Sequence, residues 1–583
     1  MAFAAPSSSA LQRLRLTSWP ARLGSALIAI AVLAPVLGLV WHALQSDTAH
    51  WSHLLANVLP VTARNTLYLL LGVGLVVSVI GTASAWLVTA YDFPGRGILV
   101  WALLLPLAIP SYVIAFAYLD LLHPLGPVQS LVRDILGYSS PREFRLPDIR
   151  SLPGAIALLG LVLYPYVYLS TRFMFQSQAA SLLEAARTLG CSAMGSFWRV
   201  ALPMARPGIA VGLALALLET LNDIGASEFL GVRTMTVAVY NTWITRSDLG
   251  AAAQLALCML VLVMALVWLE RRARQSQRFG VTQRMRPMQA KRLTGWQAGL
   301  ALLLGSLPVL LGFVAPAAYL VSATIKRLDQ AGHISSALWS SLGHTLLLAA
   351  LATLVTVLCG LLLAWQARLN MHGQRPRWAL ACARIGSLGY AIPGTILAIG
   401  LLTPMALFDQ VLSWLLQTPS LWLMGSMAAL VLAYSLRFMA ISIGGVEAGL
   451  TRIPPSLEQA SRLLGHNATG TLVRVHLPLL KPALAASALL VFVDTMKELP
   501  ATLLLRPLNI ETLATRLYAE AARGTYEEGA IAALAIVLAG LLPVVLLART
   551  RLDIASPPAA QAASPSDTST RTLYNTHEPS HIS

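Results

Sequence analysis

Acidic side chains stand at the ends of two long apolar runs, at positions related by a shift of 275 residues. Glu219 corresponds to Asp494, and Asp223 corresponds to Glu498. Charged groups that enter apolar surroundings are costly and usually functional, and carboxylate oxygens are hard ligands suited to hard cations. A path lined by acids from both segments therefore favours a metal cation or a polyamine over an anion as its cargo.

The acidic segments also have a purely structural interpretation. Carboxylates at helix ends can cap those helices or pair with Lys497, Arg233 and Arg506, because helix ends inside a membrane need polar partners. Under the functional hypothesis, Glu219, Asp223, Asp494 and Glu498 make transient contacts with the cation that passes. The full set of expected path residues is Glu219, Asn222, Asp223, Glu228, Asp494, Lys497 and Glu498.

The composition is that of a chain that crosses a membrane many times. Of 583 residues, 56% are hydrophobic and only 11% are charged, and the mean hydropathy is +0.68, far outside the usual range of soluble domains. About 20 apolar residues cross a bilayer, which predicts an all-α membrane fold of about twelve spans. These lie near 22–44, 65–90, 97–122, 152–175, 205–222, 251–269, 297–323, 344–366, 378–404, 417–443, 480–496 and 529–548.

The formal net charge of +16 comes from loops. Arg13, Arg15 and Arg22 precede the first predicted span, and a basic run occupies 271–292, between the sixth and the seventh. Loops rich in arginine and lysine stay on the cytoplasmic side, so we expect both regions, and both termini, in the cytoplasm. The lipid bilayer is an expected partner and nucleic acid is not.

The chain consists of two parallel repeats. The segment from Ser181 to Pro207 recurs as Ser456 to Pro482, and Ala108-Ile109-Pro110 recurs as Ala391-Ile392-Pro393. Six spans per repeat give both halves the same orientation, which places a transport path between them. The predicted domains are a cytoplasmic tail at 1–21, a first repeat at 22–270 with its core at 65–270, a basic cytoplasmic linker at 271–296, a second repeat at 297–548 with its core at 341–548, and a disordered cytoplasmic tail at 549–583.

Each repeat carries a polar segment that is predicted to form a short cytoplasmic helix. Ser456 and Gln459, like their counterparts in the first copy, fit a capping box, and Gly465 can adopt the left-handed conformation that ends a helix. Small residues on the helix surface let another protein approach closely, and two copies with the same spacing favour docking over a helix that rests on lipid headgroups. The predicted docking residues are Ser181, Glu184, Ala185, Ala186, Arg187 and Gly190 in the first copy and Ser456, Gln459, Ala460, Ser461, Arg462 and Gly465 in the second.

The repeated segment resembles the EAA loop of ABC importer permeases. Glu184-Ala-Ala precedes a punctuating Gly190, and the second half carries a degraded form with Gln459 in place of the glutamate. The resemblance implies the type-I importer transmembrane fold with its two halves fused. It also implies that two copies of a separate ATP-hydrolysing subunit dock on the loop helices, and that one extracytoplasmic binding protein delivers the substrate.

The sequence contains no G-x-x-x-x-G-K-[ST] phosphate loop, so we expect a partner to hold ATP. The expectation for this chain is no catalytic residue and no bound cofactor, with ATP and Mg²⁺ used by the ATPase subunit. The segments that begin at Glu219 and Met496 resemble the fused permeases of ferric iron importers. The resemblance makes ferric iron the expected substrate in a bacterial inner membrane, with transient ferric contacts at Glu219, Asp223, Asp494 and Glu498. Thiamine, a polyamine or a phosphonate as substrate, and an ion-coupled secondary transporter, are the alternatives.

Overall fold

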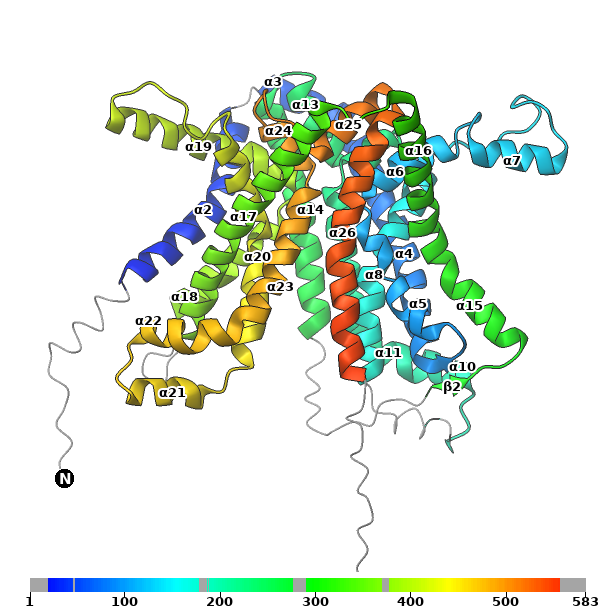
Figure 1. Cartoon of the computed structure of the whole chain (residues 1–583). Coiled ribbons are helices and arrows are strands. Elements are labelled where there is room, and N and C mark those ends of the chain that lie inside the picture. The colour runs from blue at the N-terminus through cyan, green and yellow to red at the C-terminus, as the bar shows by residue number, and fades with distance from the viewer. Residues whose placement is uncertain are drawn as a thin grey trace, which may run out of the picture. The chain divides into compact units, whose positions relative to one another are not determined.

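The computed structural model describes residues 19–45, 48–177, 186, 188–275, 290–369 and 377–555. The chain divides into two units, Met1–Val544 and Val545–Ser583, and the first contains the candidate site. This unit is built from long helices (Figure 1). In the described residues the only strands are β1 (Tyr91–Asp92) and β2 (Lys291–Arg292), which pair in parallel. The predicted all-α fold class is confirmed.

Eleven helices in the described residues are long and apolar enough to cross a membrane, five in the first half and six in the second, and a bent helix pair in the first half brings the total to twelve if it counts as one span. The helices of the first half are α2 (Trp19–Gln45), α3 (Thr48–His53), α4 (Leu59–Ala90), α5 (Arg96–Ala102), α6 (Ser111–Leu121), α7 (Pro127–Leu136), α8 (Leu152–Ser177), α10 (Ala193–Ser196), α11 (Leu202–Asn222), α12 (Gly225–Phe229), α13 (Met235–Ile244) and α14 (Leu249–Gln275). Those of the second half are α15 (Trp296–Val309), α16 (Ala315–Ala331), α17 (Ser336–Arg368), α18 (Arg377–Gly386), α19 (Gly394–Leu416), α20 (Met427–Thr451), α21 (Pro455–Leu463), α22 (Ala468–Thr471), α23 (Leu477–Met496), α24 (Pro500–Leu505), α25 (Leu513–Arg523) and α26 (Tyr526–Ala555).

Both copies of the Ala-Ile-Pro motif break a predicted span. In the first half, Arg96–Ala108 and Ser111–Leu121 meet at 91°, because Pro110 has extended backbone and no amide hydrogen to continue a helix. Pro393 likewise precedes α19. The predictions of continuous spans at 97–122 and 378–404 are therefore wrong at these points. The next predicted span, 417–443, is also shifted, because the Ser426 hydroxyl caps α20, which runs from Met427 to Thr451.

Four π-turns in the described residues each lie directly before a proline at the second position of the following helix. A proline ring clashes with the carbonyl four residues earlier, and the wider π-turn relieves that conflict without ending the helix. The long helices therefore continue past these prolines. The π-turns are Leu54–Val58, Phe197–Ala201, Leu310–Val314 and Leu472–His476, followed by Pro60, Pro203, Pro316 and Pro478.

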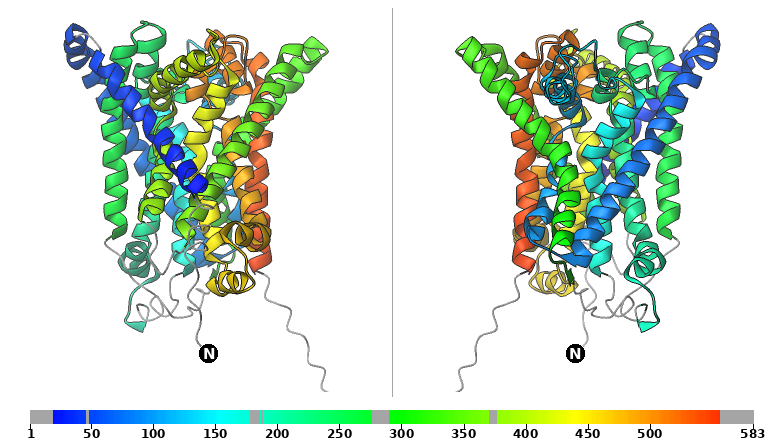
Figure 2. Two further views of the ribbon diagram at one scale, coloured as in Figure 1. Left: turned by 90° about the vertical axis from the view of Figure 1, so that its left-hand side faces the viewer. Right: turned by 90° about the vertical axis from the view of Figure 1, so that its right-hand side faces the viewer.

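Two apolar cores each combine helices from both halves. One core packs α4, α6 and α8 of the first half against α15, α16 and α26 of the second. The other packs α17, α19 and α20 of the second half against α2 and α14 of the first. Figure 2 shows α2 leaning across second-half helices in one view and the α15–α16 arm leaning across first-half helices in the other.

Glycines allow the closest of these crossings. A Cβ on Gly400 of α19 would lie 2.1 Å from the carbonyl oxygen of Pro35 in α2, and one on Gly38 would lie 2.2 Å from the carbonyl oxygen of Gly400. Small residues let helix backbones approach closely within a membrane. The two halves are therefore interlocked, and not merely placed side by side.

Corresponding parts of the two halves lie at the same end of the first unit. In Figure 1, α10 and α21, which belong to the two copies of the repeated segment, lie at one end, and α13, α24 and α25 lie at the other. This arrangement is the one expected for parallel repeats.

Candidate translocation cavity and docking loops

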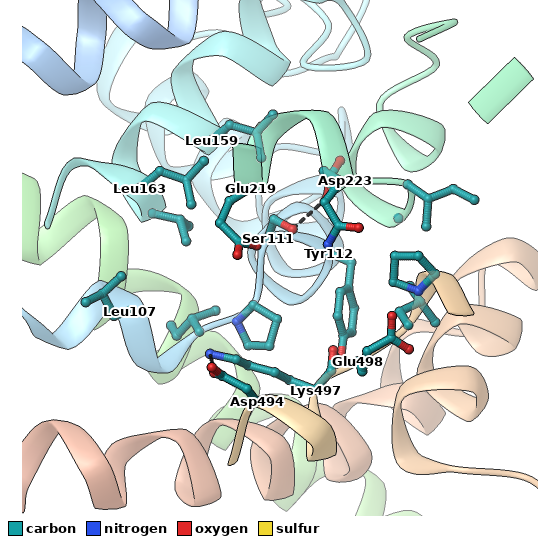
Figure 3. Close-up of a pocket in the computed structure, with 18 of the residues that line it drawn as sticks. Leu107, Ser111, Tyr112, Leu159, Leu163, Glu219, Asp223, Asp494, Lys497 and Glu498 are labelled. Carbon is teal, nitrogen blue, oxygen red and sulfur yellow. Dashed lines mark hydrogen bonds and ion pairs between the residues drawn. The ribbon is translucent and has the colours of Figure 1, made fainter. Parts of the chain in front are cut away.

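The acidic segments of the two halves meet at one cavity of about 110 Å³. Helix α11 ends at Asn222 and α23 ends at Met496, and the short helices α12 and α24 follow them. Figure 3 shows Glu219 and Asp223 on one side of the cavity and Asp494, Lys497 and Glu498 on the other. Of the predicted path residues, the cavity is lined by Glu219, Asn222, Asp223, Asp494, Lys497 and Glu498, and Glu228 lies outside this lining.

Asp223 and Glu498 act as caps for the short helices. The Asp223 carboxylate accepts a hydrogen bond of 2.7 Å from the backbone amide of Ser227, and Glu498 accepts one of 3.1 Å from the amide of Thr502. Both carboxylates are buried and also accept the hydroxyl of the same serine or threonine. The structural interpretation of the acidic segments therefore holds for these two residues, and their contact with a cation stays a prediction.

The two caps differ in their remaining partner. Ser111 donates its hydroxyl to Asp223 at 2.6 Å, whereas the Arg437 guanidinium donates from Nη1 to Glu498 at 3.0 Å. The Arg437 side chain is buried, and its Nε has no hydrogen-bond partner. Sequence reasoning missed this residue, although a lone arginine in the middle of an apolar run was a signal for it.

Gly394 provides the space for Arg437. It occupies the position of Ser111 in the repeated Ala-Ile-Pro motif, and a Cβ there would lie 2.2 Å from Arg437 Nη1. By the shift of 275, Arg437 itself corresponds to Val162 of the first half. The first half thus completes the cap of Asp223 with a serine and a valine. The second half completes the cap of Glu498 with a glycine and an arginine.

Glu219 and Asp494 keep oxygen lone pairs available to the cavity. Glu219 accepts a hydrogen bond of 2.9 Å from the Tyr390 hydroxyl, and Asp494 lies 2.8 Å from Nζ of Lys497. The phenol ring of Tyr166 also lines the cavity. The wall is therefore rich in oxygen donors contributed by both halves.

The cavity carries more acids than bases. Its lining holds four carboxylates, from Glu219, Asp223, Asp494 and Glu498, and two cationic groups, from Arg437 and Lys497. Within the described residues, no three side chains of histidine, cysteine, aspartate or glutamate are grouped to hold a metal ion. Transient ferric contacts at the four acids accordingly remain a prediction.

Glu228 connects the two halves beside the cavity. It lies on α12 of the first half and accepts a hydrogen bond of 2.5 Å from the hydroxyl of Tyr518 on α25 of the second half. Burial raises the pKa of the Glu228 carboxyl, and the hydrogen bond from Tyr518 opposes that shift. A place for Glu228 on the substrate path also stays a prediction.

The predicted docking helix is present in the second repeat as α21. Gly465 ends it with φ of +80°, and Gly190 has φ of +85° at the matching place in the first repeat. The prediction of left-handed glycines is confirmed in both copies. In the first copy, Ser181, Glu184, Ala185 and Arg187 lie outside the described residues.

Two details of the predicted docking helix are corrected by the structure. Helix α21 begins at Pro455 after Pro454 and has no side-chain cap, so the capping box at Ser456 and Gln459 is wrong: a proline at the first position already lacks the amide that needs a partner. Ser461 is buried and shares a hydrogen bond of 2.9 Å with Thr471, so it does not lie on the free surface. Ala186 of the first copy is buried as well.

The exposed side of α21 offers both polar and apolar groups. Ser456, Gln459, Ala460 and Arg462 are exposed. Beyond them, Leu463 is 89% exposed and Leu464 is 77% exposed, and Leu189, which corresponds to Leu464 in the first copy, is 85% exposed. Exposed leucines beside polar residues are typical of a protein interaction site.

Comparison with known proteins identifies the family. Residues 77–278 and 356–553 each match the model of the binding-protein-dependent transport system inner membrane components. The chain belongs to this family. It is a fused, multi-pass inner-membrane permease subunit of the ABC importer class, with the type-I transmembrane fold, and not an enzyme.

Individual relatives within the family include fused and half-size permeases. The Fe(3+)-transport system permease protein FbpB 2 of Haemophilus influenzae is 27% identical over 83% of this chain and 88% of its own length. The molybdenum transport system permease protein ModB of Escherichia coli K12 is 29% identical over 33% of this chain. The sulfate transport system permease protein CysT of Salmonella typhimurium is 26% identical over 35% of this chain. The full-length likeness is therefore to a ferric permease.

Proposed function

We propose that this chain forms the membrane path of a ferric iron importer. The observation that carries the proposal is the cavity between the halves, where four carboxylates face two cationic groups. An acidic wall of hard oxygen donors attracts a hard cation and repels an oxyanion. The likeness over most of the chain to a permease named for Fe(3+) supports the same substrate, whereas the relatives named for molybdenum and sulfate match only about a third of the chain.

In the proposed complex, two copies of a separate ATPase subunit bind at the two docking loops, and one extracytoplasmic protein delivers iron at the opposite end. The exposed leucines next to Gly190 and Gly465 support the docking sites. We also propose that the loops and both termini are cytoplasmic. Arginines precede the first span and form the basic linker between the sixth and seventh spans, and an even number of spans separates these basic regions from both loops. The ATPase subunit binds and uses ATP and Mg²⁺, and the permease chain itself holds no cofactor.

Glu219 gives the sharpest test of the substrate. The amide of Glu219→Gln can still accept the Tyr390 hydroxyl, so the variant removes charge without removing that hydrogen bond. Asp223 and Glu498 are less suitable, since their amides would also disturb the caps of α12 and α24. Loss of one negative charge from a poorly solvated path should raise the transport barrier by at least about 1.4 kcal/mol, a tenfold loss of rate.

The measurement is uptake of radiolabelled ferric iron by cells that depend on this permease, with the amount of assembled ATPase determined in parallel. Asp134→Asn, an exposed acid on α7, is the matched control and should leave uptake unchanged. Unchanged iron uptake in Glu219→Gln would show that the cavity acids are structural. Uptake of thiamine, in place of iron, by the unmodified permease would replace the proposed substrate.

A further inference from the structure

Arg368 joins three elements next to the second docking helix. It is the last residue of α17, and its Nε donates to Oε1 of Glu458, in the first turn of α21, at 2.9 Å. Its two terminal nitrogens donate to the carbonyl oxygens of Leu450 at 2.7 Å and Ile453 at 2.8 Å, at the end of α20 and just beyond it. One rigid guanidinium therefore fixes the relative positions of α17, α20 and α21.

Glu458 also faces the start of the helix that leads to the cavity. Nε2 of the buried His476 lies 3.3 Å from Glu458 Oε1, in the π-turn before α23. This contact lacks hydrogen-bond geometry and is attractive when the imidazole is protonated. Helix α23 carries Asp494 to the cavity at its other end. Glu458 thus links the docking helix to α17 and to the π-turn that precedes α23.

The contacts among Arg368, Glu458 and His476, which form one joint, are largely shielded from water, which strengthens their electrostatic attraction. The side chains of Arg368 and Glu458 are only 21% and 13% exposed, and that of His476 is 2% exposed. Exposed ion pairs contribute little because water screens them and the side chains lose entropy. Arg368 instead makes three hydrogen bonds in a single planar geometry.

The charged residues of this joint are not repeated in the sequence of the first half at the corresponding positions. In the register that matches Trp86 with Trp365, Arg368 corresponds to Thr89, whose hydroxyl donates to Ala85 of its own helix at 2.7 Å. By the shift of 275, Glu458 corresponds to Leu183 and His476 to Ala201. None of these three residues carries a charge, so the ion pairs of the joint are not repeated at the corresponding positions of the first half.

We propose that Arg368, Glu458 and His476 are positioning residues that transmit movement of the second docking helix to α17 and α23. The inference rests on the proposed docking of an ATPase subunit at each loop. It makes the two sites unequal: movement at α21 is passed on through an ion-paired joint, and the three corresponding positions of the first half hold uncharged residues. Transport driven from the second site should depend on the joint even when both ATPase copies are bound.

The test uses the full permease with its ATPase and binding protein in proteoliposomes. The variants Glu458→Gln, Arg368→Gln and the double variant are compared for bound ATPase, ATP hydrolysis rate and iron taken up per ATP hydrolysed. Each single variant should keep its ATPase and lose at least about fivefold in uptake per ATP, the lower end of typical coupling between sites. The double variant should be no worse than either single one, because the two residues act through one contact.

Thr89→Ala, at the matched position of the first half, is the control and should change none of the three readouts. Unchanged uptake per ATP in the single variants overturns the inference, and so does an additive double variant. Loss of bound ATPase in Glu458→Gln, not restored in Glu458→Asp, would instead place the residue in the docking surface and also overturn it. The docking proposal is tested separately with Leu464→Asp: if that variant still binds its ATPase fully, docking at this loop is refuted.

Discussion

The variants Arg437→Val and Gly394→Ser give the cap of Glu498 the residues that surround the cap of Asp223 in the first half. We expect each change alone to destabilise the permease and the two together to be tolerated. Arg437→Val removes the cation that pairs with buried Glu498, and breaking a buried pair costs about 3–5 kcal/mol. Gly394→Ser adds a Cβ only 2.2 Å from Arg437 Nη1, and overpacking of this kind costs about 1–3 kcal/mol. Independent effects would sum to about 4–8 kcal/mol.

The double variant is expected to lose less than about 3 kcal/mol, because the new serine can donate to Glu498 where Ser111 donates to Asp223. The valine also removes the closest contact of the added Cβ, the one with Arg437 Nη1. The free energy of unfolding is measured on the purified permease by titration with a denaturing detergent, followed by loss of helicity. Ser111→Gly in the first half calibrates the hydroxyl, which should be worth about 1.5–3 kcal/mol as a bond to a charged group.

A double variant that loses the full sum of the single losses would refute the idea that the two caps are interchangeable. A stable Arg437→Val variant would refute the premise that the Glu498 cap needs a cation.

Three further predictions follow from local geometry. Gly190→Val and Gly465→Val should each cost about 1–2 kcal/mol, because valine is strained at their left-handed positions. Each variant should co-purify with less ATPase, and the loss should be larger for Gly190→Val. Full assembly of the variant with both changes would contradict this. Gly400→Leu should destabilise the crossing of α19 with α2 by at least about 3 kcal/mol and so lower the yield of monodisperse permease. Gly299 faces open space, so Gly299→Leu should leave that yield unchanged. A cysteine replacing Arg462 should be labelled from the cytoplasm and one replacing Asp134 from outside, and labelling of both from one side would disprove the parallel orientation.

The features that the sequence predicted correctly depend on local chemistry or on repetition. The long apolar runs, the shift of 275 and the left-handed glycines at Gly190 and Gly465 can be read from residue order alone. Six of the seven residues predicted in the acidic segments line one cavity, and their contact with a substrate stays a prediction. Two of the local errors came from prolines: Pro393 broke a span, and the proline pair before Ser456 replaced the expected capping box.

The roles of individual acids were decided by tertiary contacts. Asp223 and Glu498 look like Glu219 and Asp494 in the sequence, yet only the first two meet the free amides of a short helix. Their remaining partners come from segments 112 and 61 residues away. A carboxylate's role depends on which donors surround it, and distant donors leave no trace in the local sequence.

Residue order alone establishes the repeat, the membrane class and the two short polar segments that end in a left-handed glycine. It did not determine that the first and last spans of each half pack on the other half. The physical reason is that lipid tails are as apolar as leucine, so a lipid-facing side chain and a core-facing one look alike, and packing between small residues selects the partner. Only the folded structure shows that Gly38 and Gly400 bring α2 and α19 together, and that the two halves enclose one acidic cavity.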